Sequence, residues 1–383
     1  MNTRNRRVVL AGLVSLTVFA AACGSDSKTA TTAAPTTTSA SSSGESTTTA
    51  ANTTTPVTDA VKLSATLNAS GSTFVQAFLE QEIASFTAAN SGVTINYGGG
   101  GSGKGRQDLA DTIVDFAGTD GTIKDADLSK YKGGDVLYFP VVVAPITVSY
   151  NVSGLDKLQL SPATIAKIFQ RQIKTWNDPA IATDNPGVTL PSTAITVVHR
   201  SDSSGTTGNF TKFLENSVGK ANGGIWTLGT DSTVQWSADT QAGQGNGGVA
   251  QIIKSTDGAI GYVDLSDAKD AALKFASVQN KAGKFVDPTL DAASAAAAGA
   301  KVADNLTFSA VWADGDGSYP ITAQTWIIVY AKQTDAAKAD ATKAFLKFLL
   351  TDGQQHAGDV NYAPLPADLA TKAIAQLDKI VKA

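Results

Sequence analysis

The sequence predicts an α/β protein with mostly parallel strand pairing, on three observations. Short β-branched runs alternate with amphipathic helical stretches from about residue 62 onward, and such alternation is typical of parallel sheets. Glycine- and hydroxyl-rich turns follow several of these strands and open helices. The chain has a single cysteine, so the fold is expected to depend on its apolar core and not on disulfides.

The first part of the globular region is expected to contain three strands and two helices. The strands are predicted at 63–67, 93–97 and 114–118, and the helices at 73–89 and 106–112. The helix at 73–89 is amphipathic. The side chains along its apolar face are Phe74, Phe78, Ile83 and Phe86.

The second part continues the alternation. The β-branched run at 136–150 is expected to be interrupted at Pro140 and Pro145. Further strands are predicted at 194–198, 259–263 and 325–330, and helices at 162–168, 206–214 and 335–350. The alanine-rich run at 292–300 is expected to be a helix or a loop without chemistry.

The N-terminus has the pattern of an export signal. Three arginines precede an apolar run over residues 8–22, and Cys23 follows three alanines. The run is too short for a convincing membrane span. We therefore expect a signal peptide at residues 1–22. The position of Cys23 resembles a bacterial lipobox, in which the cysteine is lipidated. The alternative is a plain secretory signal with an incidental cysteine.

Residues 23–61 are mostly serine, threonine and alanine. Such a segment cannot bury enough apolar surface to offset the entropy lost on ordering. It is therefore expected to be a disordered tether that follows the lipidated Cys23. The predicted location is extracytoplasmic, with the protein anchored to the cell membrane through Cys23.

The charge balance argues against nucleic acid as a partner. The formal net charge is -4, and loss of the three signal-peptide arginines would make it about -7. A basic stripe with interleaved aromatic residues, which nucleic-acid binding favours, is not evident. An anionic ligand would therefore have to be attracted by a local site. The two histidines and one cysteine form no metal-binding pattern, so no metal or other cofactor is expected.

The segment from Arg200 to Thr207 is the strongest sign of such a local site. It combines one arginine, several hydroxyls and a glycine directly after a predicted strand. An arginine fork fits an oxyanion, and Gly205 allows close backbone approach. If a helix begins near Thr206, its first N–H groups also favour an anion.

Two similar turns occur earlier in the chain, at 71–74 and 98–105. In α/β folds, ligands lie beyond the carboxyl ends of strands, where such turns converge. The second turn nearly matches a nucleotide-binding P-loop, but Gly105 stands where Ser or Thr would hold Mg²⁺, so we reject that reading. Likewise, the serines near His199 do not form a hydrolase nucleophile elbow, and a hydrogen-bonded or exposed His199 is expected.

Taken together, several segments resemble the successive signatures of one family. They are Gly71-Ser-Thr-Phe74, Tyr97-Gly-Gly-Gly-Gly-Ser102, Val114-Asp-Phe-Ala-Gly-Thr-Asp120, Ile173-Lys-Thr-Trp-Asn-Asp-Pro-Ala-Ile181, Arg200-Ser-Asp-Ser-Ser-Gly-Thr206, Gly258-Ala-Ile-Gly-Tyr262, Tyr319-Pro-Ile-Thr322 and Asn361-Tyr-Ala-Pro-Leu-Pro366. In this order they resemble the phosphate-binding lipoproteins and periplasmic proteins of bacterial phosphate ABC transporters (the PstS family).

The resemblance implies a two-lobed class II periplasmic-binding-protein fold with the ligand in a cleft between the lobes. Lobe I would comprise residues 62–142 plus 320–383, and lobe II residues 143–319. The implied function is a non-enzymatic, extracytoplasmic lipoprotein that captures inorganic phosphate and delivers it to membrane permease subunits. A monomer is expected.

The resemblance also implies which residues would bind phosphate. Arg200 would be the single cation, oriented by Asp202. The hydroxyl and N–H donors would come from turns of both lobes. The full set of implied phosphate-binding residues is Ser72, Thr73, Phe74, Ser102, Asp120, Arg200, Ser204, Gly205 and Thr206.

Asp120 is expected to select phosphate. Phosphate at neutral pH keeps at least one proton and can donate a hydrogen bond to a carboxylate, whereas sulfate has no proton with which to donate one. A site built to pair with a ligand hydroxyl rejects an analogue that lacks it by roughly 10⁴–10⁵.

The alternatives to a phosphate-binding protein are a binding protein for another oxyanion such as sulfate or molybdate, a secreted phosphatase or phosphoryl-transfer enzyme, and a surface protein with adhesive or signalling function.

Overall fold

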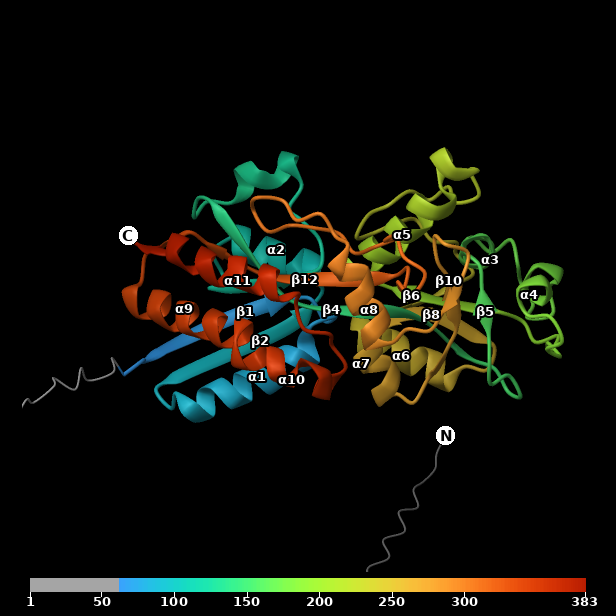
Figure 1. Ribbon diagram of the computed structural model, residues 1–383, viewed down its shortest axis with the longest axis horizontal. Helices are drawn as coiled ribbons and strands as arrows, with labels where there is room; N and C mark the ends of the chain where they lie inside the picture. The colour runs from blue at the N-terminus through green and yellow to red at the C-terminus, as the bar shows by residue number, and fades with distance from the viewer. Residues whose placement is uncertain (1–61) are drawn as a thin grey trace, which may run out of the picture. The chain divides into compact units, whose positions relative to one another are not determined.

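One long strand, β4 (Val136–Asn151), connects two groups of strands in the computed structural model, which describes residues 62–383. The first part of β4 pairs with a strand of one group, and its last residues pair with a strand of the other. Figure 1 shows β4 passing from one group into the other. The predicted signal peptide, Cys23 and the predicted tether lie outside the described residues.

Nine strands of the described residues form the main sheet. Their path is β2-β1-β3-β12-β4-β8-β6-β7, and β9 also pairs with β4. Besides β4, these strands are β1 (Ala65–Gly71), β2 (Val93–Gly100), β3 (Phe116–Thr119), β6 (Thr196–Arg200), β7 (Gln241–Gly243), β8 (Ala259–Asp264), β9 (Lys274–Phe275) and β12 (Thr322–Tyr330). The two smaller sheets contain β5 (Gln159–Leu160), β10 (Ser277–Gln279), β11 (Phe285–Val286), β13 (Lys332–Gln333) and β14 (Val381–Lys382).

The pairing is mixed, and the expectation of mostly parallel pairing is wrong for the centre of the sheet. β1 is parallel to β2 and β3, and β6 is parallel to β7 and β8. Between these two parallel groups, β12 pairs antiparallel with β3 and β4, and β4 pairs antiparallel with β8. The chain therefore crosses from one group to the other on β4 and returns on β12.

The expected interruption of β4 at Pro140 and Pro145 is also wrong. The register against β12 shifts between Thr325 and Trp326, so that Val141 is an extra residue beside Pro140. Such a bulge tolerates the missing proline N–H. Pro145 pairs with the first residue of β12, and pairing with β8 begins one residue later. Both prolines thus lie where the regular ladder changes.

Most expected helices are present, with shifted ends. The first helix begins at Gln76 and not at Thr73, because residues 73–75 form a turn. The alanine-rich run is a helix. The α-helices are α1 (Gln76–Ala89), α2 (Ser102–Ala110), α3 (Pro162–Phe169), α4 (Pro179–Asp184), α5 (Gly205–Val218), α6 (Gly245–Ser255), α7 (Leu265–Asp270), α8 (Leu290–Ala298), α9 (Ala336–Leu350), α10 (Asp352–His356) and α11 (Ala367–Gln376).

Helices cover both groups of strands. In the group that contains β1 and β2, α9 packs against β1, and the buried Phe345 ring lies 5.2 Å from the Phe86 ring and 5.8 Å from the Phe116 ring. In the other group, α5 and α6 pack against β8, where the Phe210 and Tyr262 rings stack 4.4 Å apart. These apolar contacts hold the strand ends in fixed positions.

The two parallel groups direct their carboxyl ends to one region. The turns after β1, β2 and β3 contain Ser72, Ser102 and Asp120, and those after β6 and β7 contain Ser204 and Asn246. Hydrogen bonds join the two sets of turns, including one of 2.9 Å from the Gly103 N–H to the Ser203 carbonyl. The topology therefore brings polar residues that are far apart in the sequence to one place, as expected for α/β folds.

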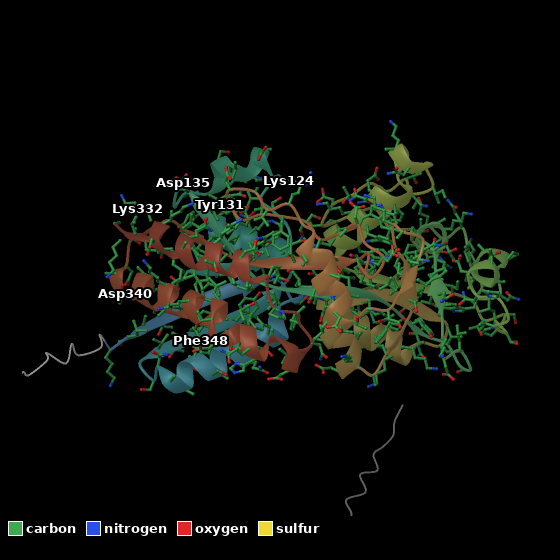
Figure 2. All side chains as sticks on the ribbon, in the orientation of Figure 1. Lys124, Tyr131, Asp135, Lys332, Asp340 and Phe348 are labelled. Atoms are coloured by element: carbon green, nitrogen blue, oxygen red, sulfur yellow. The ribbon has the colours of Figure 1, made fainter. Side chains whose placement is uncertain are left out.

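Removal of the α9 N-cap should measurably destabilise the part of the protein in which α9 packs against β1. The Asp335 carboxylate accepts hydrogen bonds of 2.9 and 3.0 Å from the N–H groups of Ala337 and Lys338. We expect Asp335→Ala to lower the free energy of unfolding in urea by about 1 kcal/mol. The matched control is Asp340→Ala on the same helix (labelled in Figure 2), where the carboxylate makes only a surface ion pair with Lys382. The control should change the free energy by less than about 0.5 kcal/mol, and equal effects of both variants would contradict the capping role.

Candidate functional site

A buried carboxylate, Asp120, lies at the centre of the converging turns. Its Oδ2 accepts hydrogen bonds from the hydroxyls of Ser72, at 2.7 Å, and Ser102, at 3.1 Å. Its Oδ1 accepts one from Thr325 on β12, at 2.7 Å. A carboxylate has about four acceptor positions, so these three bonds leave it able to accept a further proton donor.

Burial raises the pKa of the Asp120 carboxyl above its ordinary value. The hydrogen bonds from Ser72, Thr325 and Ser102 oppose this rise, and so does the positive charge of Arg200. The environment thus combines strong desolvation with a set of donors that favour the ionised form. A carboxyl held in this way is suited to share a hydrogen bond with a protonated ligand.

Arg200 is the buried cation of the site. It is the last residue of β6, and its side chain is 1% exposed. Its Nε and Nη2 donate to the two carboxylate oxygens of Asp202, at 2.8 and 2.5 Å. This bidentate pair fixes the plane of the guanidinium. Its Nη1 donates to the Thr206 hydroxyl at 3.4 Å. Asp202, which the resemblance implied would orient Arg200, is thus paired with two of its nitrogens.

The start of α5 supplies further donors. The Ser204 hydroxyl caps the helix, because it accepts a hydrogen bond from the Thr207 N–H at 3.1 Å. The next N–H groups, those of Gly205 and Thr206, have no partner within the helix because they belong to its first turn. A helix N-terminus with such free donors favours an anion.

Gly205 brings this helix start directly against Asp120. A Cβ atom on Gly205 would lie 2.4 Å from the Ser102 Oγ and 2.5 Å from the Asp120 Oδ2. Real side chains do not come so close, so any residue with a Cβ would force the two turns apart. The segment after β3 makes a further contact with the segment after α5, through the ion pair between Lys124 (labelled in Figure 2) and Asp231, at 2.7 Å.

The turn after β1 differs in part from the expectation. The Phe74 N–H, a predicted ligand donor, bonds to the Ser72 Oγ at 3.0 Å, and the ring of Phe74 is buried in the core. The Ser72 hydroxyl in turn donates a hydrogen bond to the Asp120 carboxylate. Thr73 faces the other group of strands, since its hydroxyl accepts a hydrogen bond of 3.1 Å from the Asn246 N–H.

The glycine loop after β2 places Ser102 and turns Lys104 away. The Ser102 hydroxyl accepts a hydrogen bond from the Asp120 N–H at 3.1 Å, besides donating to the carboxylate. Lys104 pairs with Asp108 on the same helix, at 2.5 Å. The lysine of this loop thus pairs within its own helix.

Sequence reasoning missed Thr325 and Asn246. Thr325 lies in the middle of β12, and no local sequence signal distinguishes it from other strand threonines. Asn246 had a signal, because Gln244-Gly-Asn-Gly-Gly248 is another glycine-rich turn between a strand and a helix. It is the same pattern that identified the other three turns.

The remaining candidates have structural roles. His199 is buried, bonds to the Arg200 carbonyl and the Thr240 hydroxyl at 2.9 Å each, and stacks on Trp236. Burial lowers the pKa of its imidazole. Within residues 62–383, no group of three or more His, Cys, Asp and Glu side chains could hold a metal ion. Every helix in that range is too short or too polar to cross a membrane.

Comparison with known proteins identifies relatives over nearly the whole described region. Residues 27–353 match the model of the PBP superfamily domain. The phosphate-binding protein PstS of Xylella fastidiosa (strain Temecula1) is 34% identical over 321 residues, which cover 82% of this chain and 85% of that protein. The phosphate-binding protein PstS 3 of Mycobacterium leprae is 36% identical over 311 residues, which cover 79% and 83%.

Solved structures show the same fold. A high-affinity periplasmic phosphate-binding protein bound with phosphate has a TM-score of 0.68 at 23% identity, with 82% of this chain and 94% of that chain covered. A phosphate-binding protein from Stenotrophomonas maltophilia has a TM-score of 0.66 at 19% identity, with 82% and 94% covered. The chain therefore has the two-lobed periplasmic-binding fold that the sequence predicted.

The raised pKa of Asp120 predicts a pH-dependent effect of Asp120→Asn on stability. The folded protein binds the Asp120 proton more tightly than the unfolded chain, so the contribution of Asp120 is most favourable below its unfolded pKa and declines as pH rises through the folded pKa. The stability of the wild type relative to Asp120→Asn should therefore fall as the pH rises from the ordinary carboxyl pKa of 3.8 toward neutral. Urea unfolding of both ligand-free proteins across this range measures it. A difference that is constant with pH, or that grows with pH, would contradict the assignment.

Proposed function

Because this chain belongs to the PstS family of phosphate-binding proteins within the PBP superfamily, we propose that it captures inorganic phosphate outside the cytoplasm and delivers it to a membrane ABC permease. Its role is that of a binding protein and not of an enzyme. The ligand is phosphate itself, and no cofactor takes part.

One observation supports phosphate as the ligand: the Asp120 carboxylate lies beside the donors of Arg200 and of the α5 N-terminus, which favour an anion. Asp120 would repel a fully deprotonated oxyanion that lies against it. A phosphate that keeps a proton can instead donate a hydrogen bond to the remaining acceptor position of this carboxylate. Sulfate, the alternative oxyanion, lacks that proton at neutral pH. The presence of Asp120 therefore favours phosphate.

The other ligand contacts follow from the positions of the donors. Arg200, held by Asp202, would bind two phosphate oxygens, and the start of α5 would supply N–H and hydroxyl donors. The Thr73 hydroxyl would donate from the other group of strands, and so would the backbone N–H of Ser102 at the start of α2, since the Ser102 hydroxyl already donates to Asp120. Ser72 would act mainly through Asp120, since its hydroxyl already donates a hydrogen bond to that carboxylate. The phosphate-binding set that we propose is Ser72, Thr73, Ser102, Asp120, Arg200, Ser204, Gly205 and Thr206. Phe74, which the sequence also predicted, is left out because its N–H already donates to the Ser72 Oγ.

Phosphate would lie between two lobes that close on it. We assign residues 62–142 and 320–383 to lobe I and residues 143–319 to lobe II. Strand β4 then crosses the boundary, the chain returns to lobe I just before β12, and each lobe contributes its own converging turns. A ligand that contacts both lobes stabilises the closed form by as much as it prefers that form over the open one.

Delivery to a permease requires that the protein stay near the membrane. We propose that residues 1–22 are a signal peptide, that Cys23 is lipidated, and that residues 23–61 tether the binding unit to this lipid anchor. The protein would act as a monomer. The support for the anchor is the sequence pattern alone.

Labelling of cells with a fatty-acid analogue, with Cys23→Ser as the control, tests this anchor. The wild type should be labelled and the variant should not.

Calorimetric titration of the phosphate-stripped protein tests the proposed function. We expect tight one-to-one binding of phosphate and no heat from sulfate. Binding of sulfate or molybdate in place of phosphate would keep the fold and overturn the ligand. A parallel assay with a chromogenic phosphate ester should show no turnover, and sustained turnover would indicate an enzyme.

The Asp120→Asn variant tests the selectivity mechanism. The amide can still accept a hydrogen bond but carries no charge to repel sulfate, so the preference for phosphate over sulfate should narrow by at least about tenfold from a wild-type ratio of up to roughly 10⁴–10⁵. Competition titrations of both anions against both proteins measure the ratio. An unchanged ratio in the variant would rule out Asp120 as the selective group.

The close approach of Gly205 predicts that a single methyl group weakens binding. In Gly205→Ala the added Cβ would collide with Ser102 and Asp120, so the two turns could not close on phosphate. We expect a loss of affinity of at least about tenfold, since such crowding typically costs about 1–3 kcal/mol. Gly208→Ala is the matched control on the same helix, because its Cβ would come no closer than 3.8 Å to another group. Equal affinities of the two variants would contradict the proposed contact.

A further inference from the structure

Asn246 occupies a position that the phosphate-binding set above does not include. It is the second residue of α6, in the turn that follows β7, and it is fully buried. The turn places it between two predicted ligand residues that belong to different groups of strands: Thr73, which follows β1, and Thr206, near the start of α5.

Asn246 donates hydrogen bonds to both threonine hydroxyls. The Thr73 Oγ1 accepts one from the backbone N–H of Asn246 at 3.1 Å and one from its side-chain Nδ2 at 3.4 Å. The Thr206 Oγ1 accepts one from the same Nδ2 at 3.2 Å and one from the Arg200 Nη1 at 3.4 Å.

These bonds use up the acceptor capacity of both hydroxyls. A threonine hydroxyl has one proton to donate and two lone pairs that accept. In Thr73 and in Thr206, two incoming donors occupy the two lone pairs. Each hydroxyl can then make only one further hydrogen bond, and in that bond it must be the donor. An anion needs donors of this kind, and a lone pair in the same position would repel it.

The orientation of the Asn246 amide decides this polarity. If the amide were reversed, its oxygen would accept the protons of the two hydroxyls and leave their lone pairs toward the ligand. In the observed orientation the Asn246 Oδ1 has no hydrogen-bond partner among the described residues. The amide therefore forgoes a bond to its own buried oxygen, which is unfavourable, while it donates to both threonines.

We propose that Asn246 is a positioning residue of the phosphate site, which orients the Thr73 and Thr206 hydroxyls as donors from opposite sides of the cleft. This inference rests on the proposed function. It makes the affinity for phosphate depend on a side chain that acts through its neighbours. It also assigns a role to the fourth glycine-rich turn, which links the two groups of strands next to the ligand.

Double-mutant cycles on phosphate affinity test the proposal. Calorimetric titration with inorganic phosphate is applied to the full chain, to Asn246→Ala, to Thr73→Val, to Thr206→Val, and to each combination of Asn246→Ala with one valine variant. We expect Asn246→Ala alone to weaken binding by at least about tenfold. When Asn246→Ala is added to either valine variant, the resulting loss of affinity should be at least about threefold smaller than its loss in the wild type. The reason is that one of the hydroxyls that Asn246 orients is already gone.

A control separates this role from general destabilisation. Asn280 is a similarly buried asparagine whose Nδ2 bonds to the carbonyls of Gly315, Asp316 and Ser318 in another part of the protein. Asn280→Ala should lower the thermal unfolding temperature and leave phosphate affinity within about twofold of the wild type. A loss of affinity in Asn280→Ala equal to that in Asn246→Ala would show that any buried asparagine matters, and would overturn the positioning role.

The outcomes distinguish this inference from the proposed function. If the wild type binds phosphate and Asn246→Ala binds it equally well, the inference fails and the proposed function stands. The inference also fails if the effect of Asn246→Ala is the same in every background, because additivity means that it does not act through the threonines. If the wild type does not bind phosphate, both fail together.

Discussion

A carboxylate removed from water needs hydrogen-bond donors. Asp120 obtains them from the hydroxyls of Ser72, which follows β1, Ser102, which follows β2, and Thr325, which lies in β12. This requirement explains much of the surrounding structure. The hydroxyls that satisfy Asp120 are not all free for a ligand, so in the proposed site the donors for the anion would come from elsewhere: from Arg200, from the start of α5, from Thr73 and from the Ser102 N–H. The site therefore contains one acceptor, surrounded by its own donors, within a larger set of donors that face it. Such an arrangement suits an oxyanion that still carries a proton.

The topology of the sheet makes this arrangement possible. Two groups of parallel strands direct their carboxyl ends to one region, and the antiparallel strands β4 and β12 connect them. Because Gly205 has no side chain, the α5 turn reaches Asp120 and Ser102 directly. The net charge of the chain is negative, so an anion at the proposed site would be attracted by this local set of dipoles and by the buried guanidinium of Arg200, which pairs with Asp202.

Local sequence patterns predicted the parts of the fold that depend on local physics. The α/β alternation, most of the helices and the three polar turns follow from periodicity, glycine and hydroxyl content. The mixed pairing could not be predicted in this way, since strand direction at β4 and β12 depends on contacts between residues nearly 200 positions apart. Pro140 and Pro145 looked like interruptions because a bulge and a change of partner strand leave no local trace. In the site, Thr325 was missed for the same reason, and Phe74 was expected to have a free N–H although the Ser72 hydroxyl two residues earlier occupies it.

The most direct test of the account is a crystal structure of the phosphate-bound protein. The account predicts one phosphate between the two groups of strands, within hydrogen-bond distance of the Arg200 guanidinium, the Asp120 carboxylate and the N–H groups that begin α5. The Asp120 contact should be an O–H···O bond of about 2.5–2.7 Å, as expected for a protonated oxyanion that donates to a carboxylate. A phosphate bound elsewhere, for example at the surface beside Arg106 and Lys124, would contradict the account. So would a phosphate in the cleft that makes no contact with Asp120.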